Sequence, residues 1–399
     1  MTRLTALFLA GLILGACRGG SDAPPETPTI AATASSPAAT ETPSPSPTPD
    51  PFASVPTDPA AAAKVLERAI PVGATDPCPA ALKSSWSALC ATGDIDGDGK
   101  PDHAYLVAIS PQGGRNPTPA AVLVRRAVTG HFETFPVDGD ADRGELGRAT
   151  FGISERTGDV AAELVFLSTS CGASNCASTV RVEHWDGSAW RDAGPGDAID
   201  NLERAEWQGT KGLSRLVVYG GRLGSVGAGP TRSVTTTYTY TNARYTTLKA
   251  EPDPPVYLYH AILDADALFL AGKFEEATAA YQAAIANKNL KDWKAEAGRD
   301  PGQPALAGYA LFRIAVATAA RNQDANAALD EVIRSSKEPL FVNAAEAFRK
   351  GYQERQTVHG ACLAVTDYLA TQGIPDYVRE MFDYGYANPP RAYRDICPL

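Results

Sequence analysis

The stretch Gly93-Asp-Ile-Asp-Gly-Asp-Gly-Lys-Pro-Asp102 runs directly into the apolar segment His103-Ala-Tyr-Leu-Val-Ala-Ile109. Aspartates alternate with other residues around two glycines, and the segment that follows has the length and composition of a buried strand. A hard cation such as Ca²⁺ takes about six to eight oxygen ligands, and a tight loop offers them at alternate positions. The sequence therefore predicts one structural Ca²⁺, held by Asp94, Asp96, Asp98, the carbonyl of Lys100, and Asp102.

Three similar strand patterns follow one another between about residue 60 and residue 250. After an alanine-rich segment that predicts a short helix, each pattern has an apolar strand, a second strand, a turn and an aromatic residue. These aromatic residues are spaced 58 and 55 residues apart, and they are Phe132, Trp190 and Tyr245. A period of this size is typical of blade-like repeats. We expect an all-β domain of about three small sheets, arranged either as an incomplete propeller-like stack or as a sandwich.

The aspartate loop resembles the calcium loop of FG-GAP (integrin-like, VCBS-type) β repeats, with Asp94, Asp96, Asp98 and Asp102 at the motif positions. In that family the aspartates bind Ca²⁺ in the turn between two strands of a blade. The second repeat keeps Gly158-Asp159 and Glu163 but loses the early ligands, and the third, at 209–212, keeps none. The resemblance therefore implies one calcium ion.

Two other interpretations of the loop are open. An EF-hand requires flanking helices and a bidentate glutamate at the end of the loop, but Tyr105 occupies that place and strand-forming residues follow. An acidic turn without metal is the second alternative, although four carboxylates this close would repel one another.

The N-terminus has the pattern of an export signal. Arg3 precedes the apolar run 4–14, which is too short for a permanent membrane span, and Leu14-Gly-Ala-Cys17 resembles a bacterial lipobox. The resemblance implies lipidation of Cys17 after removal of a signal peptide, 1–17 being the signal segment with its lipobox. Residues 18–59, rich in Pro, Thr and Ser, are expected to form a disordered tether. We expect an exported protein, lipid-anchored to the membrane or surface of a bacterial cell.

The net charge limits the class of binding partner, and the cysteine count indicates the compartment and the disulfide pairs. A net charge of −10 without a basic patch argues against nucleic acid. Six cysteines besides Cys17 are an even number for an oxidising compartment. Fifteen pairings are possible, and sequence proximity favours Cys78–Cys90, Cys171–Cys176 and Cys362–Cys397.

Residues 255–399 follow the proline-rich break 251–255 and have helical periodicity. The segment Gly272 to Ile285 resembles the turn and second helix of a tetratricopeptide (TPR) repeat, and Ala327 and Ala361 are one TPR period of 34 residues apart. Ile374 to Phe382 is expected to be a capping helix. The resemblance implies a protein-binding groove lined by Tyr259, Ile262, Asp266, Tyr309, Phe312, Asn343, Glu346 and Lys350. A purely structural helical module is the alternative.

The sequence contains no nucleophile elbow, zinc-protease helix, P-loop or dinucleotide-binding glycine pattern. We therefore expect a non-enzymatic scaffold that binds an envelope or extracellular protein or peptide. The alternative is a surface hydrolase or a glycan-binding module, because acid pairs that converge only in the fold cannot be read from the sequence.

Overall fold

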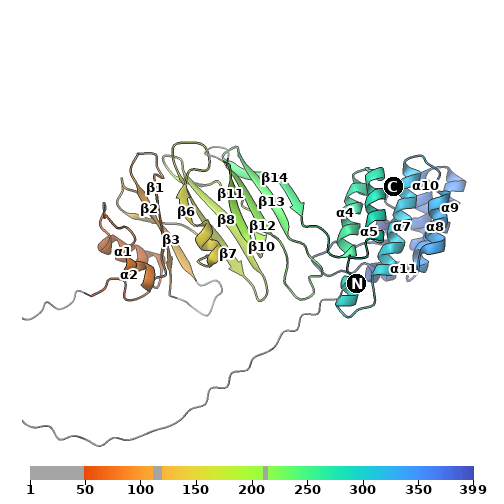
Figure 1. The fold of residues 1–399 in the computed structure, drawn as a ribbon, viewed down its shortest axis with the longest axis horizontal. Helices are drawn as coiled ribbons and strands as arrows, with labels where there is room; N and C mark the ends of the chain where they lie inside the picture. Colours follow the sequence, from red (N-terminus) through yellow and green to blue (C-terminus); the bar gives the residue numbers. More distant parts are fainter. Residues whose placement is uncertain (1–48, 111–118, 210–213) are drawn as a thin grey trace, which may run out of the picture. The chain divides into compact units, whose positions relative to one another are not determined.

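The computed structural model describes residues 49–110, 119–209 and 214–399, and residues from Pro49 onward form one compact unit. Antiparallel sheets fill the first part of this unit and helices the second, as the sequence predicts (Figure 1). The folded part starts earlier than residue 60. Phe52 is only 4% exposed, and its ring packs edge-on against Trp86 at 5.4 Å between centroids.

Two helices precede the first sheet. Asp58 caps α1 by accepting the Ala61 N–H at 2.8 Å. Sheet 1 is antiparallel with the order β1-β2-β3-β4, so each strand pairs with its neighbour in sequence. The elements are α1 (Pro59–Ala69), α2 (Ala80–Ser85), β1 (Leu89–Gly93), β2 (Asp102–Ala108), β3 (Ala120–Arg125) and β4 (Phe132–Thr134).

Sheet 3 repeats this meander, and sheet 2 repeats it in four consecutive strands and adds two short strands. Sheet 2 has the order β10-β8-β7-β5, with β6 paired to β7 and β9 paired to β8, and sheet 3 has the order β11-β12-β13-β14. Sheet 2 contains β5 (Asp140–Ala141), β6 (Gly152–Ser154), β7 (Glu163–Cys171), β8 (Cys176–Trp185), β9 (Trp190–Asp192) and β10 (Ile199–Asp200), with α3 (Glu145–Thr150) between β5 and β6. Sheet 3 contains β11 (Arg204–Gln208), β12 (Arg215–Gly220), β13 (Val234–Thr241) and β14 (Arg244–Pro252).

The three sheets pack face to face through separate apolar cores. Alternate residues of β2 face opposite ways: Tyr105 packs against α1 and α2, while Leu106 packs towards sheet 2. Likewise Phe166 of β7 faces sheet 1, and its neighbour Val165 faces sheet 3. Because β2 and β7 are buried on both faces, their sequences are nearly continuous apolar runs.

The three sheets can form an open stack, without closing into a ring, because the outer faces of sheets 1 and 3 are each covered in a different way. Helices α1 and α2 cover the free face of sheet 1. At the other end, β12 buries Leu216 and Val218 towards sheet 2, and in β14 only Tyr245 is buried. The strand sequence Val234-Thr-Thr-Thr-Tyr-Thr-Tyr-Thr241 supplies hydroxyl groups to this outermost sheet. Solvent can therefore cover sheet 3 at little cost.

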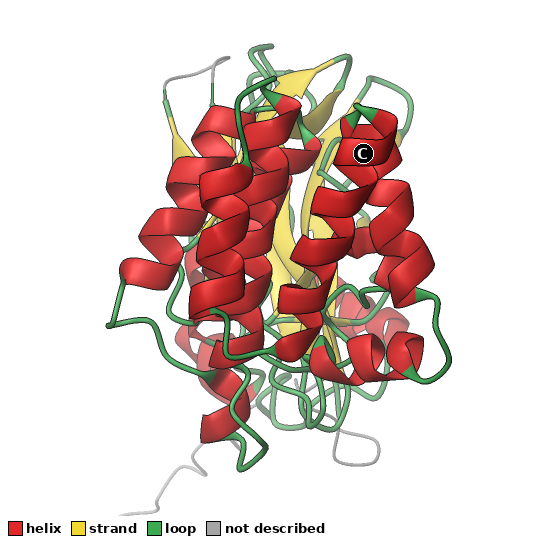
Figure 2. Cartoon of the chain, turned by 90° about the vertical axis from the view of Figure 1, so that its right-hand side faces the viewer, coloured by secondary structure: helices red, strands yellow, loops and turns green. Residues whose placement is uncertain are grey.

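The helical half contains three helix pairs packed in chain order (Figure 2). The final helix, Ile374–Met381, is not the predicted cap on the last pair, because its end is held by hydrogen bonds from Lys294 to the carbonyls of Glu380 and Met381. The core of the helical half holds the alanines at the helix contacts, among them Ala277 and Ala361, both with no exposed surface. The pairs are α4 (Leu258–Leu270) with α5 (Phe274–Ala286), α7 (Gln303–Ala320) with α8 (Asn326–Ser335), and α9 (Pro339–Arg355) with α10 (Val358–Leu369). The remaining elements are α6 (Trp293–Glu296), α11 (Ile374–Met381) and the 3-10 turn η1 (Tyr393–Ile396).

The loop between β12 and β13 joins the two halves. Arg232 forms two hydrogen bonds with Asp264 of α4, at 2.9 and 2.6 Å, and His260 Nε2 lies 3.0 Å from the carbonyl of Pro230. The N–H of Tyr386 also donates to the carbonyl of Gly227 at 3.1 Å. The β and α segments are therefore joined by polar contacts, not only by the linker.

Candidate functional site

The aspartate loop connects β1 to β2, as the sequence predicts. Gly97 and Gly99 have φ of +73° and +79°, which glycine adopts without strain. Oxygens of Asp94, Asp96 and Asp102 lie within 4.8 Å of one another. Asp98 lies outside this group, because its carboxylate accepts the Lys100 N–H at 2.8 Å and lies 3.4 Å from the Lys100 ammonium. The structure thus brings together three of the four predicted aspartates.

The three grouped aspartates fit a cation. Asp94 Oδ1 is buried and has no hydrogen-bond donor, and a bound ion would satisfy it. Asp102 is fully buried and serves the fold as well: its two oxygens accept the N–H groups of Ile95 at 2.8 Å and Ala127 at 2.7 Å. Burial raises the pKa of Asp102, and the nearby Asp96 and Asp98 add to this. A divalent cation would offset that unfavourable charge.

A second loop, between β6 and β7, has the same construction. Residues 94–101 and 155–162 are eight residues each, and in both sheets an acid starts the following strand, paired across from the last residue of the preceding one. Glu163 thus corresponds to Asp102, and Glu155 corresponds to Asp94. The sequence motif of the second repeat, taken from Thr157 to Glu163, leaves out Glu155.

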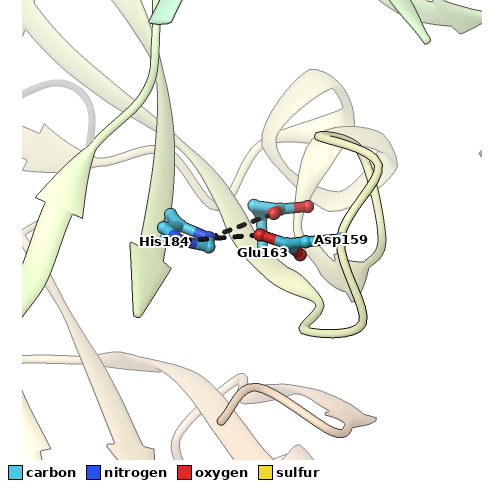
Figure 3. A group of neighbouring side chains, drawn as sticks. All are labelled: Asp159, Glu163 and His184. Atoms are coloured by element: carbon cyan, nitrogen blue, oxygen red, sulfur yellow. Dashed lines mark hydrogen bonds and ion pairs between the residues drawn. The ribbon is translucent and has the colours of Figure 1, made fainter. Parts of the chain in front are cut away.

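Glu163 holds its loop as Asp102 does. It is fully buried, and it accepts the Arg156 N–H at 2.6 Å and the Thr157 hydroxyl at 2.5 Å. Burial is the main cause of its raised pKa. His184 lies beside it, with Nδ1 3.3 Å from Glu163 Oε1 and Nε2 3.6 Å from Asp159 Oδ2 (Figure 3). No local sequence motif joins His184 to the acids, because it lies on the neighbouring strand β8.

The residue that corresponds to His184 in sheet 1 is Arg126. Continuing each ladder by one residue beyond its last pair, His103 with Arg125 and Leu164 with Glu183, places Arg126 opposite Asp102 and His184 opposite Glu163. Arg126 lies 3.8 Å from Asp96, donates to Glu133 at 2.7 and 3.0 Å, and packs over the ring of Trp185 in sheet 2. The first loop thus has a permanent cation beside its acids, whereas the second has an imidazole.

The two loops touch. The N–H of Ala162 donates to the carbonyl of Asp94 at 2.8 Å. Gly93 makes this approach possible, because a Cβ there would lie 2.4 Å from Cγ2 of Ile153. The two acidic loops therefore form one edge of the packed sheets 1 and 2.

The predicted groove of the helical half is largely covered by the chain itself. Five of the eight predicted groove residues are buried, and they are Tyr259, Ile262, Asp266, Tyr309 and Phe312. The C-terminal segment 382–399 covers part of this set: Tyr384 stacks on Tyr259 at 3.9 Å, and Phe382 packs edge-on against Tyr309 at 5.3 Å. A partner would reach these side chains only by displacing that segment.

Asp266 is the polar centre of this contact. It accepts hydrogen bonds from the hydroxyls of Tyr281 and Tyr309 and pairs with Arg391 from the C-terminal segment. Burial raises the pKa of Tyr309 to about 12, so the hydroxyl stays protonated and can donate. A buried carboxylate is tolerated because two guanidinium groups, of Arg391 and Arg313, and two hydroxyl donors surround it. The remaining predicted groove residues, Asn343, Glu346 and Lys350 on α9, are exposed.

The cysteine pairs favoured by proximity are disulfide-bonded in the structure. Their Cα–Cα distances are 6.0 Å for Cys78–Cys90, 4.0 Å for Cys171–Cys176 and 5.2 Å for Cys362–Cys397. The last of these fastens the C-terminal segment to α10. Cys17, the signal segment and most of the predicted tether lie outside the described residues.

No protein-family model matches the chain, and no curated protein or solved structure is significantly similar to it. Among the residues that the structure describes, no helix has the length and apolar character needed to cross a bilayer.

Proposed function

We propose that this protein is a lipid-anchored, non-enzymatic scaffold of the bacterial cell envelope that binds another protein or peptide through its helical half. The observation that carries the proposal is the way α4 and α7 hold the C-terminal segment. That segment is held by ring stacking on Tyr259 and by the ion pair between Arg391 and Asp266. Aromatic packing combined with an arginine–carboxylate pair is typical of protein-recognition surfaces.

The open part of the same surface is on α9. Asn343, Glu346 and Lys350 are spaced three and four residues apart, so they share one face of the helix, opposite the buried Phe341 and Phe348. The TPR resemblance assigns these residues to the groove beyond the part that the chain itself fills. We infer that a partner segment binds here, next to the C-terminal segment.

In this proposal the β half is a spacer and support. One calcium ion in the first loop would hold the turn between β1 and β2 and take no part in binding the partner. A lipid on Cys17 and the tether would keep the folded unit close to the membrane while leaving the helical half accessible.

A charge-reversal experiment tests the binding surface in the full-length protein. Glu346→Lys with Lys350→Glu should reduce partner recovery from envelope extract by about tenfold or more, because both charges would then oppose the partner. The matched control is Glu275→Lys with Lys288→Glu, which makes the same changes at exposed positions in α5 and just after it. Equal recovery with both double variants would overturn the proposed surface.

A further inference from the structure

Three metal-ligating side chains meet at the second loop: Asp159 in the loop itself, Glu163 at the start of β7 and His184 on β8. One oxygen each of Asp159 and Glu163 and one ring nitrogen of His184 lie within 4.8 Å of one another. In Figure 3 these three side chains point towards a common centre, Glu163 from the start of β7 and His184 from β8. The Asp159 side chain is 47% exposed, so the centre is open to solvent on one side.

This centre differs from the first loop in the residue at the cross-strand position, and Arg156 of its own loop interacts with the charge of Glu163. Two carboxylates converge there, and one of them, Glu163, has no exposed surface. In sheet 1 the corresponding cross-strand position holds Arg126, whose guanidinium always carries a charge. In sheet 2 it holds His184, and an uncharged imidazole gives no counter-charge but offers a lone pair.

An imidazole with two carboxylates suits a different metal from the all-oxygen set of the first loop. Calcium takes oxygen ligands, whereas Zn²⁺ and related divalent transition ions accept imidazole nitrogen together with carboxylate oxygen. An imidazole that binds a metal through one nitrogen commonly donates its other N–H to an oxygen. His184 meets both acids, because Nε2 faces Asp159 and Nδ1 faces Glu163.

We propose that Asp159, Glu163 and His184 form a binding site for a divalent transition metal ion, of which Zn²⁺ is the best match. Three protein ligands leave a coordination position for water or for a further donor on the exposed side. The hydrogen bonds that Glu163 receives from the Arg156 N–H and the Thr157 hydroxyl orient its carboxylate towards His184. The site is independent of calcium in the first loop and of any partner on α9.

Zn²⁺ titration of untagged full-length protein tests this site, by calorimetry near neutral pH with excess Ca²⁺ present. We expect stoichiometric binding to the unchanged protein. His184→Arg, which copies the arrangement around Arg126, should preserve the fold while lowering Zn²⁺ affinity by more than about 100-fold. Asp159→Asn alters an exposed ligand and should weaken binding too, although its Oδ1 can still accept the Ala161 N–H.

The matched control is His131→Arg. His131 is an exposed histidine 3.6 Å from Glu67, so it represents casual binding of metal to a surface histidine–acid pair. This variant should bind Zn²⁺ as the unchanged protein does. The proposal is overturned if the unchanged protein binds no Zn²⁺, or if His184→Arg and Asp159→Asn, both shown by circular dichroism to be folded, bind it with unchanged affinity.

Discussion

The two acidic loops have the same length, the same strand register and an anchoring acid at the same position. They differ in the basic residue that lies near their acids. Asp102 and Glu163 each start a central strand and hold the preceding loop through main-chain N–H groups. In the first loop Arg126 approaches Asp96 and contacts Glu133 and Trp185, whereas in the second His184 contacts Glu163. The anchoring acid therefore serves the fold in both repeats, whereas the cross-strand residue decides which cation the loop suits.

The largest expected effect is on the free energy of unfolding, and it tests the anchoring acid that both loops have. Asp102→Ala removes the acceptor of two N–H groups, at Ile95 and Ala127, and should lower the free energy of unfolding by about 3 kcal/mol. Glu163→Ala should cost a similar amount. Asp98→Ala, at an exposed position in the first loop, is the control and should cost less than about 1 kcal/mol. Urea unfolding measures all three, and a cost for Asp102→Ala no greater than the control would refute the anchoring role.

A smaller effect, a change in Tm on removing calcium, distinguishes the first loop from the second. If the first loop alone binds Ca²⁺ with the millimolar affinity common outside cells, removing the ion costs about 1 kcal/mol. EGTA should then lower the Tm by roughly 2 °C and excess Ca²⁺ should restore it. Asp159→Asn should respond like the unchanged protein, and Asp94→Asn with Asp96→Asn should not respond. An unchanged Tm in the parent protein would contradict calcium binding.

The smallest effect concerns pH and Glu163. Burial raises the pKa of Glu163 in the folded protein above its ordinary value of 4.5. The protonated form therefore contributes stability that is fully present below about pH 4.5. This contribution is lost as the pH rises through the folded-state pKa. Glu163→Gln carries no charge to bury. Its stability relative to the parent protein should therefore increase from about pH 4.5 towards neutrality in the presence of a chelator.

Urea unfolding over this pH range checks the Glu163 prediction. Glu145→Gln, at an exposed position in α3, is the control and should show a constant difference from the parent protein. A constant difference for Glu163→Gln as well would show that its burial has no consequence for stability.

Much of this architecture could be predicted from local sequence. The apolar runs of β2 and β7, the glycine-rich aspartate loop and the recurring turn aromatics indicate three antiparallel sheets. Helical periodicity after residue 255 indicates the second half. These features are local, because strand and helix periods and turn chemistry act over a few residues.

The candidate sites depended on contacts between distant parts of the chain. Arg391 and Asp266 are 125 residues apart in sequence, and no local pattern predicts that the C-terminal segment would cover the predicted groove. The TPR resemblance identified positions on helices but not what would pack against them. Tyr259 and Tyr309 are therefore core residues here, while Glu346 and Lys350 remain on the surface.

The sequence by itself determined the element types, the first acidic loop and the favoured cysteine pairs, because each depends on residues close together in the chain. Only the tertiary structure decided which side chain faces each loop. Strand register set Arg126 against Asp102 and His184 against Glu163, and register is fixed by how the sheets bury their apolar faces. The chemical difference between two otherwise matching loops thus arises from packing over the whole β half.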